Sequence, residues 1–189
     1  MKRIVVSTFF LVSILFACSS DPVVETATDV PIEDFSPKEV VAEDSLFSIG
    51  VLANMRSTKS IDDWASVQYS DLLRSHYLVV SNFRKSEIDF KDFQSFAKEK
   101  LKAFCDSREI IKESSQVELT IDGLDAVAKA VDVKEYGSPK ALSYWLGCIN
   151  GKKDVYIVKL WTLRERKEFF EKEANAILRS FKELNLPIQ

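Results

Sequence analysis

The side chains that commonly carry acid–base chemistry are few in this sequence, and their positions favour structural roles. His76 is the only histidine among 189 residues, so it cannot supply a histidine-rich metal set, and it stands at a predicted turn. The carboxylates of Asp62 with Asp63, and of Asp122 with Asp125, also fall in predicted turns, where aspartate is common for local hydrogen bonding. The five glycines form no phosphate-binding loop. We therefore predict that the protein is not an enzyme and carries no cofactor or metal.

A cysteine closes the N-terminal segment. Lys2 and Arg3 precede an apolar run that ends at Phe16, and its length of about 13 residues is below the roughly 20 that span a bilayer as a helix. A small residue, Ala17, then precedes Cys18. These features predict a secretory signal. An ordinary leader cleaved by the general signal peptidase, which leaves Cys18 as a free thiol, is the alternative.

The sequence Leu15-Phe16-Ala17-Cys18 resembles the lipobox of bacterial lipoproteins. The resemblance implies that residues 1–17 are removed and that Cys18 receives a diacylglycerol thioether and an N-acyl chain such as palmitate. Several acyl chains hold a protein firmly at a membrane, whereas one chain binds marginally. In such lipoproteins a serine after the cysteine, here Ser19, favours the outer over the inner membrane. We therefore expect a protein anchored in the bacterial cell envelope.

The acidic residues are concentrated directly after this cysteine. Eight of the 29 acidic residues, but only Lys38 of the 26 basic ones, lie between residues 19 and 44. This stretch is also rich in proline and poor in aromatic residues, so we predict that residues 18–44 form a disordered tether. Residues 45–189 are nearly neutral and have the length of one globular domain. A body without basic excess argues against nucleic acid as a partner.

The two remaining cysteines leave two alternatives. Cys105 and Cys148 would share an oxidising compartment, where they could form a disulfide. The alternative is that they are separate buried thiols that pack as small apolar side chains. Sequence spacing does not decide, because a disulfide requires Cα atoms within about 7 Å.

Two further sets of residues could form a binding surface. Arg164, Arg166 and Lys167 stand at the start of a predicted helix, where cations oppose the helix dipole. We interpret them as a solvated face, and a patch that docks a partner protein is the alternative. The aromatic residues alternate along predicted strands, which favours core positions over an aromatic-lined cleft for a small ligand or metal ion. They are Trp64, Tyr77, Tyr144, Trp145, Tyr156 and Trp161.

The elements that would position these residues follow from hydrophobic periodicity. Alternation predicts strands at 46–52, 64–69 and 77–83. Apolar residues three and four apart then predict an amphipathic helix over 89–104, with Asp89 as its N-cap and Asp92 in its first turn.

The second half predicts a four-stranded meander. Strands at 117–121, from 124 onward, at 142–149 and at 155–161 are separated by Asp122-Gly123, by a break at 137–139 and by Asn150-Gly151. Asp-Gly and Asn-Gly favour type I′ turns, in which both central residues have positive φ. The last strand is apolar on both faces and should lie inside the sheet.

A closing helix should cover this sheet. Thr162 and Glu165 form a predicted capping box, and Pro187 follows the expected end of the helix. The alanines at 126, 128 and 130 share one strand face, which predicts close packing of a helix. The apolar stripe of the helix consists of Phe170, Ala174, Ile177, Leu178, Phe181 and Leu184. Two helices on one large antiparallel sheet give the α+β class.

This order of elements resembles the PsbP-like superfamily, which includes the DcrB-type bacterial lipoproteins. The residues that carry the resemblance are 47–49, 89–104, 121–126, 150–156 and 180–181. The resemblance covers residues 45–189 and implies an αβα sandwich, in which one large antiparallel sheet is flanked by two main helices. It also implies an accessory or binding role without catalysis, and it transfers no site residue. We therefore expect a lipid-anchored envelope protein that binds a partner protein, with small-ligand or metal-ion binding as the alternative.

Overall fold

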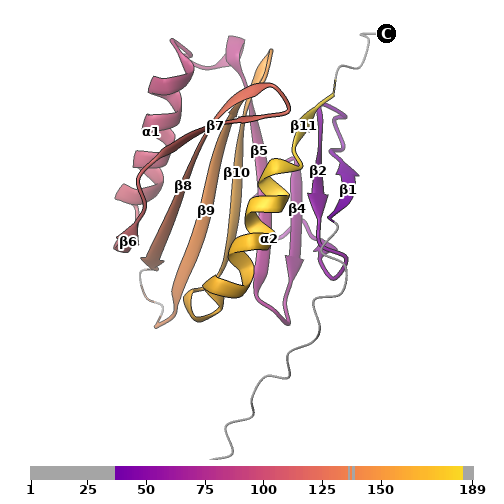
Figure 1. Ribbon diagram of the computed structural model, residues 1–189. Helices are drawn as coiled ribbons and strands as arrows, with labels where there is room; N and C mark the ends of the chain where they lie inside the picture. The colour runs from indigo at the N-terminus through magenta and orange to yellow at the C-terminus, as the bar shows by residue number, and fades with distance from the viewer. Residues whose placement is uncertain (1–36, 136, 138, 185–189) are drawn as a thin grey trace, which may run out of the picture. The chain divides into compact units, whose positions relative to one another are not determined.

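Antiparallel strands dominate the part of the chain that the computed structural model describes, residues 37–135, 137 and 139–184. Within these residues an eight-stranded sheet has the order β3-β4-β5-β10-β9-β8-β6, and β7 also pairs with β8 (Figure 1). Its strands are β3 (Arg56–Ser57), β4 (Val67–Asp71), β5 (His76–Arg84), β6 (Glu109–Glu113), β7 (Val117–Ile121), β8 (Leu124–Lys134), β9 (Ala141–Asn150) and β10 (Asp154–Leu163). A smaller sheet has the order β1-β2-β11, formed by β1 (Lys38–Val41), β2 (Phe47–Val51) and β11 (Lys182–Glu183).

One helix covers each face of the large sheet (Figure 1). These helices are α1 (Phe93–Asp106) and α2 (Lys167–Arg179), and short 3-10 helices η1 (Lys85–Glu87) and η2 (Arg164–Arg166) precede them. Along β9, Tyr144, Leu146 and Cys148 pack with α1, whereas Trp145 and Ile149 pack with α2. Because successive side chains of a strand point to opposite faces of the sheet, β9 contributes residues to the core on each face. The predicted α+β fold with an αβα sandwich is confirmed.

The predicted meander is also present. Strands β7, β8, β9 and β10 follow one another as antiparallel pairs, and β10 lies between β9 and β5 with both faces largely buried. Asp122 and Gly123 have φ of 50° and 78°, as the predicted type I′ turn requires. Gly151 does not have a positive φ. It is needed instead because an added Cβ would overlap the side chains of Glu183 and Tyr156.

Small residues let α2 approach the sheet closely. Ala126, Ala128 and Ala130 belong to the core beneath α2, as predicted. Gly147 on β9 adds to them, because a Cβ at this position would lie 2.5 Å from Cδ1 of Leu178. Helix α2 therefore packs against the backbone of β9 at Gly147 as well as against side chains of the sheet.

Both helices begin later than predicted. The N-cap of α1 is Asp92 and not Asp89, since the Asp92 carboxylate accepts a 2.8 Å hydrogen bond from the backbone N–H of Ser95. The capping box at Thr162 and Glu165 is wrong. Thr162 still belongs to β10, its buried Oγ1 has no hydrogen-bond partner, and η2 precedes the first residue of α2.

Strands β4 and β6 differ from the prediction, and the closing helix ends at Arg179, so that Phe181 and Leu184 lie beyond it and β11 follows. The strand expected over 64–69 begins only at Val67, because residues 58–66 form a loop that folds against β4. The sequence analysis missed β6, whose five residues are all exposed and therefore show no burial pattern. The sequence did not decide whether Cys105 and Cys148 form a disulfide. In the structure both are free thiols.

The predicted tether is too long at its C-terminal end. Residues 38–41, which were expected to be disordered, form β1 and pair with β2 from Lys38–Val51 to Val41–Ser48. Ala42 is 3% exposed and belongs to the core. The folded domain therefore includes residues before 45. The signal, Cys18 and the rest of the tether up to residue 36 lie outside the described residues.

Candidate functional site

A groove on the α1 face of the large sheet is the candidate functional site. Helix α1 packs on β6, β8 and β9, and its Phe96 also contacts Phe83 of β5, so that part of this face on β10 and β5 stays open. Loop 58–66 rises at the other side of the opening. Between them lies a groove of about 660 Å³. Its walls are Lys100, Leu101 and Phe104 of α1 with Asp62 and Trp64 of the loop, and its floor is Ser81, Asn82, Phe83, Leu146, Cys148, Ile157 and Lys159.

The loop wall is fixed by hydrogen bonds. The side-chain Oε1 of Gln68 accepts from the backbone N–H groups of Ile61 and Asp62, each at 3.0 Å, and its Nε2 donates to the Asp62 carbonyl at 2.6 Å. The Nζ of Lys159 donates to Asp62 Oδ2 at 2.7 Å. The other carboxylate oxygen of Asp62 accepts from the N–H of Trp64 at 3.0 Å. These bonds hold Trp64 at the rim of the groove, where it is 89% exposed.

The exposed lining of the groove is largely apolar, although Ser81, Asn82 and Lys159 of the floor are polar. Leu146, Cys148 and the α1 residue Leu101 are buried, and Ile157 is half-buried. Burial raises the pKa of the Cys148 thiol to about 12, against the opposing charge of Lys100. A thiol with this pKa is protonated at neutral pH and is a poor nucleophile. The floor is therefore suited to contact an apolar group.

Lys100 supplies the cation of the α1 wall. Its Nζ lies 5.2 Å from the ring centre of Phe96 and 5.8 Å from that of Phe83. Glu99, the adjacent residue, lies 3.6 Å away and its side chain is 74% exposed. Such an exposed pair is weak. The two lysines and one aspartate among the lining residues give the groove a net charge of +1.

The predicted aromatic residues divide among three places. Trp145 and Tyr156 are buried on the α2 side, as expected for core residues. Tyr77, Trp161 and Tyr144 stack across β5, β10 and β9 on the α1 side, with centroid distances of 5.0 and 5.5 Å. Within the described chain, none of the six except Trp64 lines the groove.

The sequence analysis missed Phe83 and Phe104, which also line the groove. The strand period places Phe83 on the same face as Tyr77, so this signal was present. The sequence could not show that α1 stops short of that part of the sheet.

All three residues of the predicted basic patch contact other parts of the chain. Lys167 Nζ lies 2.9 Å from Asp132 Oδ1, and Arg164 Nε lies 3.6 Å from Asp132 Oδ2. Ser143 also donates to this carboxylate, at 2.8 Å. Although burial raises the pKa of Asp132, these hydrogen bonds and charges lower it below its usual value. Arg166 points elsewhere and donates to the Leu73 carbonyl at 2.9 Å.

His76 is not the solvated turn residue that the sequence analysis expected. It begins β5, its side chain is 5% exposed, and its ring stacks on Phe170 with centroids 4.1 Å apart. Its Nδ1 lies 3.4 Å from Oε2 of the buried Glu173. Because Glu173 belongs to α2, the pair lies on the α2 face of the sheet. It therefore contributes no catalytic group to the groove, which lies on the α1 face.

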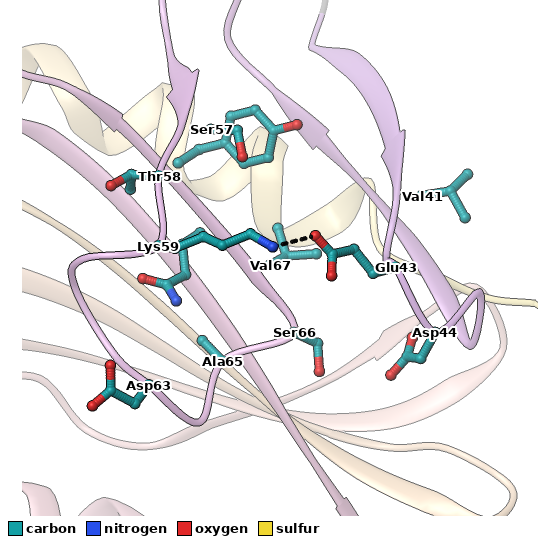
Figure 2. A pocket seen from close by; sticks show the side chains of 12 residues that line it. Val41, Glu43, Asp44, Ser57, Thr58, Lys59, Asp63, Ala65, Ser66 and Val67 are labelled. Atoms are coloured by element: carbon teal, nitrogen blue, oxygen red, sulfur yellow. Dashed lines mark ion pairs between the residues drawn. The ribbon is translucent and has the colours of Figure 1, made fainter.

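A second, polar pocket of about 530 Å³ lies between the β1–β2 turn and the segment from β3 to β4 (Figure 2). Lys59 reaches across it to Glu43, and the two form a 3.0 Å ion pair whose side chains are both 81% exposed. Asp44 and Asp63 lie at its rim (Figure 2). Because this pair is solvated and the lining is polar, the pocket offers less to an apolar ligand than the groove does.

The described part of the chain contains no helix long and apolar enough to cross a membrane. The same residues contain no group of three or more His, Cys, Asp or Glu side chains that could hold a metal ion.

No family model matches the sequence, and neither does any curated protein. Solved structures that are similar to the chain include the following three. CyanoP, the PsbP protein of the cyanobacterium Synechocystis sp. PCC 6803, has a TM-score of 0.57 and 12% identity over 82% of this chain and 96% of that chain. LpqN, involved in cell envelope biogenesis of Mycobacterium tuberculosis, has a TM-score of 0.56 and 13% identity over 78% and 90%.

The third structure is a protein of unknown function from Pseudomonas aeruginosa, with a TM-score of 0.51 and 12% identity over 80% of this chain and 99% of that chain. Sequence identities this low indicate a shared fold only. The chain therefore has a PsbP-like fold, as its sequence resemblance predicted.

Proposed function

We propose that this chain is a lipid-anchored, non-enzymatic accessory protein of the bacterial cell envelope that acts by binding a small, largely apolar ligand in the groove beside α1. The observation that carries the proposal is the open apolar floor between α1 and the anchored loop 58–66. Its volume of about 660 Å³ is within the range of roughly 300–1,000 Å³ typical of small-molecule sites. The lining carries no pair of groups arranged as nucleophile and base.

The envelope location rests on two supports. Leu15-Phe16-Ala17-Cys18 resembles a lipobox, and the similar structure LpqN belongs to a protein involved in cell envelope biogenesis. If the anchor is the lipid on Cys18, Cys18→Ala should move the protein from the membrane fraction to the soluble fraction. A variant that stays with the membranes contradicts the anchor.

The groove is tested with the neutral fluorescent compound N-phenyl-1-naphthylamine. The wild-type protein should bind it with enhanced fluorescence, and Ile157→Asp should weaken binding at least ten-fold because it places a charge on the floor. The same substitution at Ile111, 42% exposed on β6 and away from the groove, is the matched control. Wild-type protein that does not bind, or equal binding by Ile157→Asp, contradicts the proposal.

A partner protein is a second candidate, favoured by the tip of the β4–β5 hairpin. Leu72 and Leu73 at this tip are 76% and 91% exposed, and Arg166 ties the tip to the start of α2, where Phe169 is 66% exposed. Crosslinked native envelopes should then yield a near-stoichiometric partner that is lost with Leu72→Ser/Leu73→Ser. Val117→Ser, at a residue 57% exposed on β7, should keep that partner.

A further inference from the structure

We infer that the ligand of the groove is a single-chain amphiphile with an anionic headgroup, whose alkyl chain lies on the apolar floor and whose headgroup pairs with Lys100. The inference rests on the proposed function and specifies the ligand. Carboxylate and phosphate headgroups share the required chemistry, which is a compact negative charge on one unbranched chain.

The first argument is the difference between the two lysines of the groove. Lys159 already has a carboxylate partner within the protein, Asp62, at 2.7 Å. Among the described residues, the only carboxylate within 4 Å of the Lys100 ammonium is that of the neighbouring Glu99, at 3.6 Å, whose side chain is 74% exposed to water. The side chain of Lys100 itself is 35% exposed. A ligand anion can therefore displace a weak, solvated partner at Lys100, whereas at Lys159 it would have to compete with a hydrogen-bonded one.

The second argument is the surroundings of the Lys100 ammonium group. It lies beside the rings of Phe83 and Phe96, at 5.8 and 5.2 Å from their centres. Phe83 also lines the groove. The cation therefore stands directly at the border of the apolar floor, so one ligand can place its charge at Lys100 and its chain on the floor without burying the charge.

The third argument is the placement of Trp64. The hydrogen bonds of Gln68 and Lys159 to Asp62 hold loop 58–66 so that this indole stays 89% exposed at the rim opposite α1. An exposed large aromatic side chain beside an open apolar floor is a typical ligand contact. Lys100 and Trp64 belong to opposite walls. A chain that starts at Lys100 therefore runs over the floor towards Trp64.

The test compares ligands that have the same chain and different headgroups. Decanoate, monodecyl phosphate, decanol and decyltrimethylammonium are titrated below their micelle concentrations against the full-length protein, and the blue shift of tryptophan emission reports binding. We expect both anions to bind at least ten-fold more tightly than decanol, and the cation to bind most weakly. The tighter of the two anions identifies the headgroup. Trp64→Phe should remove most of the shift and keep binding in calorimetry.

Lys100→Met should weaken decanoate binding about ten-fold and leave decanol binding unchanged. The matched control is Lys98→Met, at an exposed lysine of the same helix that does not line the groove. Raising the ionic strength should reduce the preference for anions. Equal binding of decanoate and decanol, or equal decanoate binding by Lys100→Met, overturns the inference and leaves an apolar groove that binds N-phenyl-1-naphthylamine. Failure of that neutral compound and of all four decyl compounds overturns the proposed function as well.

Discussion

Burial decides the charge state of individual residues in this protein, and His76 is an example. Desolvation lowers the pKa of His76 from 6.5 to about 4. The charge of Asp71 opposes this shift, and Arg74 and Arg166 add to it. The neighbouring Glu173 shifts in the other direction, because burial raises its pKa. Both partners of this pair therefore favour the neutral form.

We predict that the free energy of unfolding falls as the pH is lowered from 6.5 to 4. In this range the unfolded chain binds a proton at His76 and the folded protein does not, which costs about 3 kcal/mol in total. Glu173 acts in the opposite sense, since its raised pKa lowers stability as the pH rises above 4.5. In urea titrations, His76→Gln should lose the His76 contribution, so that stability no longer rises between pH 4 and 6.5 and the remaining effect of Glu173 can reverse the slope. An unchanged slope in this variant contradicts the assignment to His76.

The basic residues before α2 lead to a second prediction at this scale. Asp132 is buried, and Lys167 is its hydrogen-bonded partner at 2.9 Å. We expect Lys167→Met to destabilise the protein by about 1–2 kcal/mol, less than a fully broken buried pair, because Arg164 and Ser143 still contact the carboxylate. Lys172→Met, at an exposed lysine of α2, should change the free energy of unfolding by less than about 0.5 kcal/mol. Equal values for both variants would show that the contact with Asp132 is not stabilising.

At the scale of elements, the distance between α2 and the sheet is set by small residues. Gly147 faces Leu178, and a Cβ there would lie 2.5 Å from Leu178 Cδ1. We predict that Gly147→Ala destabilises the protein by about 1–3 kcal/mol through overpacking. Leu178→Ala alone should cost about 2–5 kcal/mol through the cavity that it leaves. The double variant should cost clearly less than the sum, because each change relieves the other. Additive losses in thermal or urea unfolding would contradict this contact.

At the scale of the whole molecule, the N-terminal limit of the folded domain leads to a prediction. Strand β1 pairs with β2 along its full length, and Ala42 is part of the core. A chain that begins at Ser45 should therefore melt at a lower temperature than one that begins at Pro37, because β2 loses its β1 partner and the core loses Ala42. Equal melting temperatures in calorimetry would show that β1 contributes nothing to the domain.

The sequence by itself determined which residues alternate and which recur at helical spacing, and hence the meander, the two helices and the α+β class, whereas the αβα sandwich was implied by the resemblance to the PsbP-like superfamily. These features are local, since a strand period of two and a helix period of 3.6 are visible in any window of residues. The exposed β6 was missed for the same reason. All five of its residues are exposed, so its sequence shows no alternation of apolar and polar residues that would indicate a strand.

The groove was decided only by the tertiary structure. Trp64, Phe83, Lys100 and Phe104 come from a loop, a strand and a helix, and the sequence places each of them without stating how far α1 extends across the sheet. The sequence also could not show that Arg164 and Lys167 share Asp132 as a partner, because Asp132 lies more than 30 residues earlier in the chain. Periodicity specifies which face a side chain occupies. Which side chains meet on that face depends on the packing of distant elements, and this packing alone creates the groove.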